Sequence, residues 1–409
     1  MIPVEKPRAI LKRYRLCDAC LGRQFAHDAT PEQSVRLGRE IRRLVGQDNE
    51  SPEGECFICF PTRQQLSELE ERVPQAMQGI ECDTIQVGVS MSDAVTRRED
   101  ELRIRYSLLE GESIRRELSH RAGIRLAQRL GAKIDFEKPD VTLIFELSGK
   151  APKLEIQINP IFIFGRYRKL ERGITQTKRY CPSCRGKGCE TCSFTGYEPG
   201  ESIEFMIARE MMKLFGGSDW KFHGAGREDV DARMLGNGRP FVIEILNPTK
   251  RKRDLGEFER ETNGRWQGRL EIFGLRHSTR REMQHIKTKK FDKTYELVIS
   301  FSDDVTEDAL RALPEKVSGC EVRQQTPLRV LPRRKDTVRR RLIKGLQILM
   351  VDIPARKAQV RLRAESGLYV KEFLAGDGGR TDPSVKGMLG AANLEVESLD
   401  VVSVHDDFQ

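Results

Sequence analysis

Eight of the ten cysteines of this 409-residue chain occur in four C-x-x-C pairs, and this pattern constrains the fold more than any other feature. The pairs are Cys17/Cys20, Cys56/Cys59, Cys181/Cys184 and Cys189/Cys192. A C-x-x-C turn supplies two thiolates from one tight knuckle, and two such turns complete the tetrahedron that zinc prefers. Redox pairs or reduced thiols are the alternatives, but each pair here has a second pair to match it. The sequence therefore predicts structural zinc.

The two groups of cysteines differ in their spacing. The first four are expected to form one site that ties the N-terminus to a later segment. The last four could form another, although only four residues separate Cys184 from Cys189 and this short spacer could strain a single tetrahedron. One structural zinc is therefore expected, and a second is left open. Neither group includes a His or carboxylate that would leave a coordination position free for catalysis.

Positive charge is concentrated in three parts of the chain, whose formal net charge is +9. The clusters lie at 166–179, 250–253 and 333–344. Separate basic patches suit an extended polyanion better than a small anion, although any one patch could be a solvated face. No run of eighteen apolar residues occurs and the N-terminus lacks the apolar stretch of a signal peptide, so a cytoplasmic protein without a membrane segment is expected.

The hydrophobic pattern predicts an α+β protein with two main parts. In the first part, residues 34–46 and 112–131 have helical patterns, and 140–147 and 153–160 alternate as strands do. In the second part, a helix at 202–216 precedes strands at 241–246, 295–301, 346–353 and 358–364. Several strands with few helices between them indicate a mixed or antiparallel sheet. We expect domains at 1–165 and 201–409, joined by a basic, cysteine-bearing linker at 166–200.

A glycine-rich stretch at 222–240, FHGAGREDVDARMLGNGRP, contains little that could be buried. It includes neither a phosphate-binding P-loop nor a strand-linked G-x-G-x-x-G, so nucleotide hydrolysis is disfavoured. GAGRED predicts a tight turn that presents Arg227 and Asp229 together ahead of a strand. Such a turn is a good platform for a catalytic acid, base or nucleophile. The plainer interpretation is that Asp229 bonds to local backbone.

The same stretch resembles a known catalytic signature. GREDVDAR is similar to the G-R-x-D motif of pseudouridine synthases, and the longer string is similar to the version in the tenth family, the T-loop enzymes of tRNA. LCDACLGRQFA, FGRYRKLERGITQTKRYCPSC, KTYELV, TPLRVLPRRKD and GLYVKEFLAGDGGRTDPSV also resemble that family, in its order. The resemblance covers nearly the whole chain and is least distinct between about 80 and 150. GRED alone would be a weak signal.

The resemblance implies a fold and a reaction. It implies an N-terminal module with a THUMP domain and a zinc knuckle, followed by a pseudouridine synthase domain on a mixed sheet. The reaction detaches uracil from C1' of a uridine in the T loop, at position 54, 55 or both, and rejoins it through C5 without a cofactor. The catalytic aspartate falls on Asp229, with Glu228 and Asp231 as its neighbours. Asp229 either forms a covalent adduct with the sugar or acts as a base.

The resemblance also implies roles for residues outside the turn. Lys371 would pair with Asp229, and Tyr295 would stack on the target base. Val370 and Leu399 would complete the apolar wall. Arg227 could enter the base stack or pair with Glu228 or Asp231. Without the resemblance, structural explanations would be favoured for four of these side chains: a core strand position for Tyr295, a surface position for Lys371, and simple packing for Val370 and Leu399.

Substrate and partners follow from the same resemblance. The partner would be tRNA, bound by a monomer. The residues expected to contact RNA phosphates are Arg166, Arg168, Lys169, Arg333 and Arg334. Pro332 stands where the family commonly has His, so a base-specific role there is in doubt. A non-catalytic RNA-binding protein or chaperone is the alternative function. An RNA methyltransferase or thiouridine enzyme is disfavoured, because neither a dinucleotide-type glycine loop nor a PP-loop follows.

Overall fold

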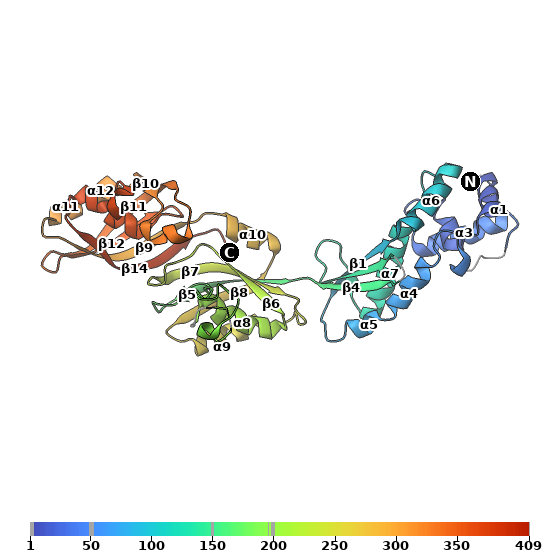
Figure 1. Ribbon diagram of the computed structural model, residues 1–409, viewed down its shortest axis with the longest axis horizontal. Helices are drawn as coiled ribbons and strands as arrows, with labels where there is room; N and C mark the ends of the chain where they lie inside the picture. Colours follow the sequence, from blue (N-terminus) through green and yellow to red (C-terminus); the bar gives the residue numbers. More distant parts are fainter. Residues whose placement is uncertain (1–3, 49–52, 149–150, 195, 198–200, 409) are drawn as a thin grey trace. The chain divides into compact units, whose positions relative to one another are not determined.

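The chain folds into two compact units, each with its own hydrophobic core. The computed structural model describes residues 4–48, 53–148, 151–194, 196–197 and 201–408 (Figure 1). The first unit comprises Met1–Pro160 and Asn247–Arg251, and the second comprises Ile161–Leu246 and Lys252–Gln409. Within the described residues, no helix is both long and apolar enough to cross a bilayer.

The first unit contains a small four-stranded sheet, with helices before its first strand and between its first and second strands (Figure 1). Its helices are α1 (Glu5–Arg13), α2 (Asp18–Gly22), α3 (Pro31–Leu44), η1 (Glu53–Glu55), α4 (Thr62–Glu70), α5 (Val73–Ala76), α6 (Asp93–Tyr106) and α7 (Ile114–Leu130). Its strands are β1 (Thr84–Met91), β2 (Lys133–Ile134), β3 (Val141–Leu147) and β4 (Lys153–Ile158). The strand order is β2-β1-β3-β4, in which only the β3/β4 pair is antiparallel.

Sequence patterns in the first unit predicted these elements well. The helical pattern at 34–46 falls within α3 and its C-terminal end, and the one at 112–131 corresponds to α7. Both helices begin after an N-cap residue whose side chain accepts a backbone hydrogen bond: Thr30 accepts from the amide of Gln33, and Ser113 accepts from the amide of Arg116. β3 alternates strictly between buried and half-buried residues, because one face of its sheet packs on the core.

The second unit is built on a ten-stranded mixed sheet, which confirms the predicted fold class. Its strands are β5 (Ile161–Lys169), β6 (Asp219–Gly224), β7 (Arg233–Leu246), β8 (Leu270–Ser278), β9 (Asp292–Phe301), β10 (Glu321–Gln325), β11 (Val338–Asp352), β12 (Lys357–Ala364), β13 (Thr381–Asp382) and β14 (Leu394–His405). Its helices are η2 (Glu190–Cys192), α8 (Ile203–Phe215), α9 (Leu255–Arg265), α10 (Arg280–Thr288), α11 (Glu307–Arg311), α12 (Leu313–Val317), η3 (Leu328–Arg333), α13 (Val370–Ala375), η4 (Asp377–Gly379) and α14 (Val385–Leu389).

The strand order β13-β10-β11-β12-β9-β14-β7-β5-β8, with β6 beside β7, places two distant parts of the chain side by side. Every pairing in this sheet is antiparallel except that of β14 with β7. Helices α8 and α9 pack near the β5/β8 end, and α11 and α12 pack near the β10/β11 end (Figure 1). The β14/β7 junction therefore joins the two halves of the unit.

The predicted domain boundaries at 165 and 200 both fall inside this second unit. Residues 161–169 form β5, which pairs with both β7 and β8. In the sequence, the alternation of Arg166 and Arg168 with buried Tyr167 and Lys169 was assigned to a basic linker. Their side chains instead alternate between the two faces of a strand, so part of the expected linker belongs to the sheet.

Glycine is required where β7 meets β14. Gly236 has a φ of +56°, and a Cβ added there would overlap the carbonyl oxygen of Val402. Because only glycine fits this backbone conformation and this close approach, Gly236 lets the two strands that carry the parallel junction come together.

We predict that Gly236→Ala destabilises the second unit by roughly 2–5 kcal/mol, since it combines left-handed strain with overpacking. Urea unfolding followed by tryptophan fluorescence measures this change, because Trp220 and Trp266 are the two tryptophans of the chain and both lie in the second unit. Gly264→Ala is the control: Gly264 lies in α9 with open space around it, so alanine should be neutral or slightly stabilising. Equal midpoints for the two variants would contradict this role of Gly236.

Candidate active site

A cavity of about 850 Å³ in the second unit brings together segments that are far apart in the sequence. Its walls include the turn between β6 and β7, strands β9 and β14, η3, and the start of α13. The predicted catalytic and base-contacting residues all line it: Arg227, Asp229, Tyr295, Val370, Lys371 and Leu399. The structure therefore places in one cavity residues that are up to 172 positions apart (399 − 227).

The turn that carries Asp229 begins with a backbone conformation that glycine adopts more easily than any other residue. Gly226 has a φ of +88°, and its amide donates a hydrogen bond to the carbonyl oxygen of Gly224, at 2.8 Å. The Asp229 carbonyl oxygen accepts a bond from the amide of Ala232, at 3.1 Å. The Asp229 side chain is 43 % exposed, so its carboxylate is accessible from the cavity.

A buried ion pair holds the turn that carries Asp229 against the core of the second unit. Arg239, on β7, donates to the carboxylate of Glu228 at 2.8 Å and to the carbonyl oxygen of Ala225 at 2.7 Å. The Tyr167 hydroxyl donates to the same carboxylate, at 2.8 Å. Burial lowers the Arg239 pKa and the neighbouring Glu228 carboxylate raises it, with a net increase. Both side chains are almost fully buried, so Glu228 anchors the turn and Asp229 is left to face the cavity.

Lys169 has a different place from the one predicted for it. Its side chain is completely buried, and its ammonium donates to the carbonyl oxygens of Ile174 at 2.9 Å, Asp229 at 3.1 Å and Val230 at 3.1 Å. An ammonium in this position cannot reach an RNA phosphate at the surface. Gln176 donates to the Gly226 carbonyl oxygen, at 2.9 Å. The turn is thus held through its backbone on both sides of Asp229.

The cations nearest to Asp229 come from two segments. The closer is Arg329, in η3, whose Nη2 lies 3.2 Å from Oδ2 of Asp229. Lys371 Nζ lies 4.0 Å from the same oxygen but only 2.5 Å from Oδ2 of Asp231. Burial raises the Asp231 pKa, but the hydrogen bond and the positive charge of Lys371, together with smaller contributions that include the charge of Arg329, outweigh burial, so this pKa is lowered. Asp229 therefore shares Lys371 with Asp231, and Arg329 is its nearer partner.

The apolar part of the cavity is formed by residues that the sequence pattern also places in the core. Tyr295 is buried on β9, where it lies opposite Val401 of β14. Burial raises the Tyr295 pKa to about 12, so its hydroxyl stays protonated at neutral pH. Val370, at the start of α13, and Leu399, on β14, are also buried and line the same cavity.

Arginines dominate the polar part of the cavity lining. They are Arg179, Arg227, Arg239, Arg329, Arg334, Arg339 and Arg341. Arg227 is exposed, and the described residues offer it neither a hydrogen bond nor an ion pair; Glu228 is held by Arg239, and Asp231 by Lys371. Arg334 is exposed and lies near the Tyr369 hydroxyl, at 3.5 Å. The side chain of Arg333 lies outside the part of the structure that is described.

The two arginines of β5 that were predicted to contact phosphates already have intramolecular partners. Arg166 forms a bidentate ion pair with Asp406, at 2.6 and 3.0 Å. Arg168 donates to Glu271 at 2.8 Å and lies over the ring of Phe273. Neither arginine lines the cavity. A phosphate contact would require either guanidinium to share or exchange its carboxylate.

Sequence reasoning missed three cations of the site: Arg239, Arg329 and Lys293. Arg239 precedes an apolar strand and Arg329 interrupts an apolar turn, but no local pattern shows that a carboxylate lies beside either one. Lys293 belongs to the same K-T-Y-E-L-V segment as Tyr295, two residues away on β9. Because alternate residues of a strand share a face, this spacing was a usable signal that Lys293 faces the cavity.

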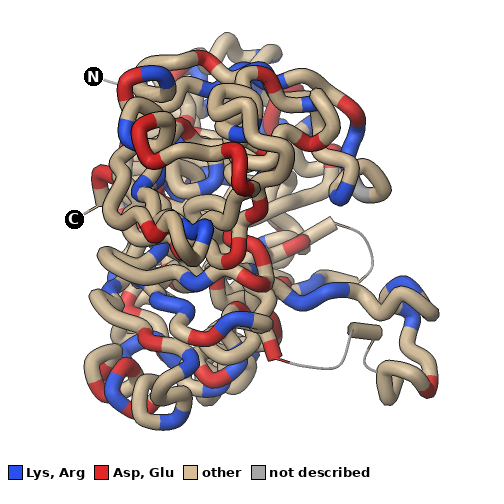
Figure 2. The backbone as a smooth tube through the Cα atoms, turned by 90° about the vertical axis from the view of Figure 1, so that its left-hand side faces the viewer, with Lys and Arg blue, Asp and Glu red and all other residues tan. Residues whose placement is uncertain are grey.

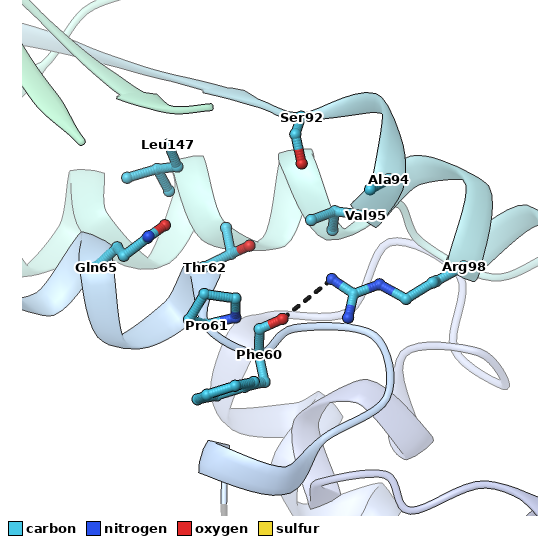
Figure 3. A pocket seen from close by; sticks show the side chains of 9 residues that line it. All are labelled: Phe60, Pro61, Thr62, Gln65, Ser92, Ala94, Val95, Arg98 and Leu147. Atoms are coloured by element: carbon cyan, nitrogen blue, oxygen red, sulfur yellow. Dashed lines mark hydrogen bonds between the residues drawn. The ribbon is translucent and has the colours of Figure 1, made fainter. Parts of the chain in front are cut away.

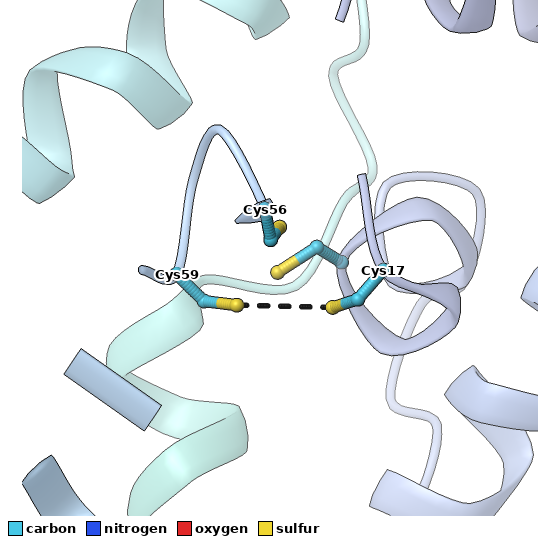
Figure 4. Close-up of side chains that lie close together, drawn as sticks. Cys17, Cys56 and Cys59 are labelled. Carbon is cyan, nitrogen blue, oxygen red and sulfur yellow. Dashed lines mark hydrogen bonds between the residues drawn. The ribbon is translucent and has the colours of Figure 1, made fainter. Parts of the chain in front are cut away.

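The first cysteine group is assembled as predicted. The thiols of Cys17, Cys20, Cys56 and Cys59 converge within the buried core of the first unit, and all four Sγ atoms lie within 4.8 Å of one another (Figure 4). Cys17 Sγ and Cys59 Sγ are 3.7 Å apart. A zinc–sulfur bond of about 2.3 Å implies a tetrahedral edge of about 3.8 Å, so this cluster fits a zinc ion.

The second cysteine group also converges despite its short spacer. The Sγ atoms of Cys181, Cys184, Cys189 and Cys192 lie within 4.8 Å of one another, with three separations of 3.8 Å. The spacer makes its turn through positive φ values at Arg185, Gly186 and Gly188, which relieves the expected strain. Backbone amides donate to Sγ of Cys184 and Cys192, as suits thiolate ligands. Lys and Arg are frequent along the loop that leads into this cluster (Figure 2).

The first unit has a separate pocket of about 460 Å³ (Figure 3). Phe60, Thr62 and Gln65 line one side, and Ser92 and Arg98, from α6 and its N-cap, line the other (Figure 3). Arg98 donates to the carbonyl oxygen of Phe60, at 3.0 Å. Among the described residues that line this pocket, Arg98 is the one with a charged side chain.

Comparisons with known proteins agree on one family. Residues 162–405 match the model described as "Pus10, C-terminal", and residues 69–146 match "Pus10 THUMP domain, archaeal". The chain is 40 % identical to the tRNA pseudouridine synthase Pus10 of Methanothermobacter marburgensis, over 95 % of each chain. It is 37 % identical to the protein of the same name from Pyrococcus furiosus, over 99 % of each chain.

The solved structures that resemble this chain are more distant. A structure entitled "Crystal Structure of a Cbf5-Nop10-Gar1 Complex" matches with 18 % identity and a TM-score of 0.31, over 51 % of this chain and 46 % of that chain. A likeness this weak carries no argument about the site. The assignment to a family depends on the sequence matches.

We predict that Arg239→Met destabilises the second unit by about 3–5 kcal/mol, because it leaves the Glu228 carboxylate buried without its cation. The double variant Arg239→Met/Glu228→Gln should lose less stability than the sum of the losses of the two single variants, since the buried charge of Glu228 is then also removed. Urea unfolding followed by tryptophan fluorescence provides the measurement. If the double variant were as unstable as the sum of the two single variants, the two residues would not be coupled.

Proposed function

The chain belongs to the Pus10 family, and on that basis we propose that it is a tRNA pseudouridine synthase that isomerises uridine in the T loop, at position 54, 55 or both. The observation that carries the proposal is the convergence of Asp229, Tyr295 and Lys371 on one cavity. These residues belong to three separate segments, so their meeting is a property of the fold and not of a local motif.

Asp229 is the catalytic carboxylate in this proposal. It is half exposed to the cavity, whereas Glu228 is buried in an ion pair and Asp231 is bonded to Lys371. Asp229 is also held through its own backbone, because its carbonyl oxygen accepts a hydrogen bond from Lys169. An ionised carboxylate in this position can attack C1' of the ribose or remove a proton from the sugar.

Tyr295 provides the surface for the target base. A uridine within folded RNA must leave its stack before its sugar can reach Asp229, which costs a few kcal/mol. Stacking on an aromatic ring returns roughly 1–3 kcal/mol per base. The flanking side chains of Val370 and Leu399 are apolar and buried, so they exclude water from the ring faces of the bound base.

Cations around the cavity serve the substrate in two ways. Arg329 and Lys371 hold the carboxylates of the turn in place. Arg179, Arg334, Arg339 and Arg341 lie further around the cavity lining, where an RNA backbone would supply phosphates. Arg227 has no partner among the described residues, so it is available to occupy the space that the extracted base leaves. Phosphate contacts by Arg166, Arg168 and Arg333 stay predictions.

We propose that the isomerisation needs no cofactor, because the breaking and the forming bond both involve the same uridine. Zinc would be structural and bound by both cysteine groups, with the first inside the core of the N-terminal unit and the second in the loop after β5. The first unit, which matches the archaeal THUMP model, would contribute RNA binding. A cytoplasmic monomer bound to tRNA remains our expectation.

We predict that Asp229→Asn abolishes pseudouridine formation and leaves tRNA binding intact. The parent and the variant are incubated with unmodified tRNA transcript, pseudouridine is mapped at each position, and Kd is measured in parallel. The variant should be at least about 1000-fold slower with Kd changed less than about threefold, because asparagine has nearly the same shape but cannot act as nucleophile or base. Asp219→Asn, at the exposed start of β6, is the matched control and should retain activity.

The outcomes separate an enzyme from a non-catalytic RNA-binding protein. Product from the parent and from Asp219→Asn, but not from Asp229→Asn, supports the synthase. Tight tRNA binding without product from any of the three proteins would remove the proposed activity. Product at a site outside the T loop would keep the activity and change the substrate assignment.

We predict two zinc ions per chain, measured by elemental analysis of the protein purified without added metal. Cys17→Ser and Cys181→Ser should each lose one zinc, and Cys82→Ser should keep both, since Cys82 belongs to neither cluster. The Cys17 variant should also lose stability, because its cluster lies within the core of the first unit. One zinc per chain that Cys181→Ser does not remove would show that the second cluster is not a metal site.

A further inference from the structure

Lys293 is a buried lysine of the candidate active site that has no role in the reaction proposed above. It is 6 % exposed, lines the cavity and lies on the same face of β9 as Tyr295, two residues away. A methyl group placed on Gly226 would lie 3.4 Å from Lys293 Nζ. The ammonium therefore lies against the turn that carries Asp229, on the strand face that also carries the proposed stacking residue Tyr295.

The ammonium of Lys293 is poorly satisfied for so buried a group. Its one recorded hydrogen bond goes to the carbonyl oxygen of Phe291, at 3.1 Å, and no carboxylate among the described residues pairs with it. Lys169, the other buried lysine of the site, places its three donors on three carbonyl oxygens. Two N–H donors of Lys293 are thus left without an acceptor that the structure records.

The charged groups around Lys293 make its positive charge costly. Arg239, on β7, is a second buried cation close by, since the same methyl on Gly226 would lie 3.0 Å from its Nη1. Asp292, on the same strand, favours the charge but points to the other face. The residues paired with Lys293 on the neighbouring strands are Ala364 and Val404, which do not titrate. Burial, with the repulsion from Arg239, lowers the Lys293 pKa to about 7.

An unpaired ammonium that faces a reaction cavity is more often functional than structural, because folding alone gains nothing from it. The missing partner would be an acceptor or an anion supplied by the substrate. In the proposed reaction, the C1'–N1 bond breaks, its electron pair stays with the ring, and the detached uracil carries negative charge on N1 and its two carbonyl oxygens. This charge develops beside Tyr295.

We propose that Lys293 is a catalytic residue that donates a hydrogen bond to a carbonyl oxygen of the target uracil and stabilises the ring as it becomes anionic. The inference rests on the proposed synthase function. Lys293 keeps its proton throughout: when the ring turns and C5 bonds to C1', the hydrogen on C5 is lost as a proton and N1 gains one, so the net reaction is an isomerisation. A donor aimed at developing charge in a dry cavity typically changes the rate by 10²–10³-fold.

The test compares Lys293→Met with the parent under single-turnover conditions on unmodified tRNA. Methionine keeps the length and apolar stem of lysine. We expect a rate about 100-fold lower, tRNA Kd within about threefold of the parent, and no loss of thermal stability. Lys316→Met, which removes an exposed lysine of α12, is the matched control and should react at the parental rate. A parental rate from Lys293→Met would overturn the assignment.

The pH dependence of kcat/KM distinguishes a charged Lys293 that acts on the substrate from a Lys293 that only packs against its neighbours. In the free enzyme Lys293 loses its proton near pH 7, so kcat/KM of the parent should fall as pH rises above about 7. In Lys293→Met, this alkaline decline should be absent. If the variant were slow but kept the decline, the titrating group would lie elsewhere and the proposal would fail.

The stability of the protein gives an independent readout, because it should rise with pH where kcat/KM falls. Because the folded-state pKa of Lys293 is below its unfolded value of about 10.4, the unfolded chain binds more protons between about pH 7 and 10.4, and the parent gains stability as pH rises through this window. Lys293→Met should therefore be at least as stable as the parent at pH 6, and its advantage in Tm should shrink by pH 9. A variant that is much less stable at pH 6 would indicate a structural lysine.

A more stable leaving anion should reduce the need for Lys293. Fluorine at C5 withdraws electrons from the ring, so the deficit of Lys293→Met in consuming 5-fluorouridine at the target position should be smaller than its deficit with uridine. An equal deficit for both nucleotides would mean that Lys293 acts on the placement of Asp229 and not on the ring. Failure of the parent itself to make pseudouridine would instead refute the proposed function.

Discussion

The ion pair between Arg239 and Glu228 is the constraint on which the rest of the candidate active site depends. Both groups are buried, and each has a second polar contact, to the Ala225 carbonyl oxygen and the Tyr167 hydroxyl respectively. Removing either partner would strand a charge in the core, which costs several kcal/mol. The turn therefore has one stable arrangement, and in that arrangement the next acid along the chain, Asp229, faces the cavity. The anchor residue and the reacting residue are neighbours in sequence with opposite environments.

The strand order of the sheet explains how residues from distant segments of the chain come together in one site. β14 pairs with β9 on one side and, in parallel, with β7 on the other, so Tyr295, Leu399 and the turn before β7 meet at one junction. Around that junction the cations divide by task. Lys169 and Arg239 are fully buried and hold backbone and carboxylate groups of the protein. Four other arginines of the cavity lining, Arg179, Arg334, Arg339 and Arg341, are those left for RNA in the proposed function.

The sequence predicted contacts and elements that depend on neighbouring residues better than it predicted contacts between residues far apart in the chain. Local signals worked: the alternation of β3, the helical period of α7 and the paired cysteines all describe what a few neighbouring residues do. The resemblance to a family placed Asp229, Tyr295 and Lys371 in one site, and the structure brings them to one cavity. What failed was pairing over long distances. Nothing near Arg329 shows that it lies closer to Asp229 than Lys371 does, and the basic pattern at 166–169 concealed a strand in which Lys169 is buried.

The most direct test of this account is a crystal structure of the protein bound to a tRNA that carries 5-fluorouridine at the target position. The account predicts that the nucleotide has left its stack, that the base lies on Tyr295, and that C1' is within about 3–3.5 Å of an Asp229 carboxylate oxygen. It also predicts a ring oxygen within hydrogen-bond distance of Lys293 Nζ. A target base that binds away from the cavity, or an Asp229 that stays bound to Arg329 and out of reach of the ribose, would contradict it.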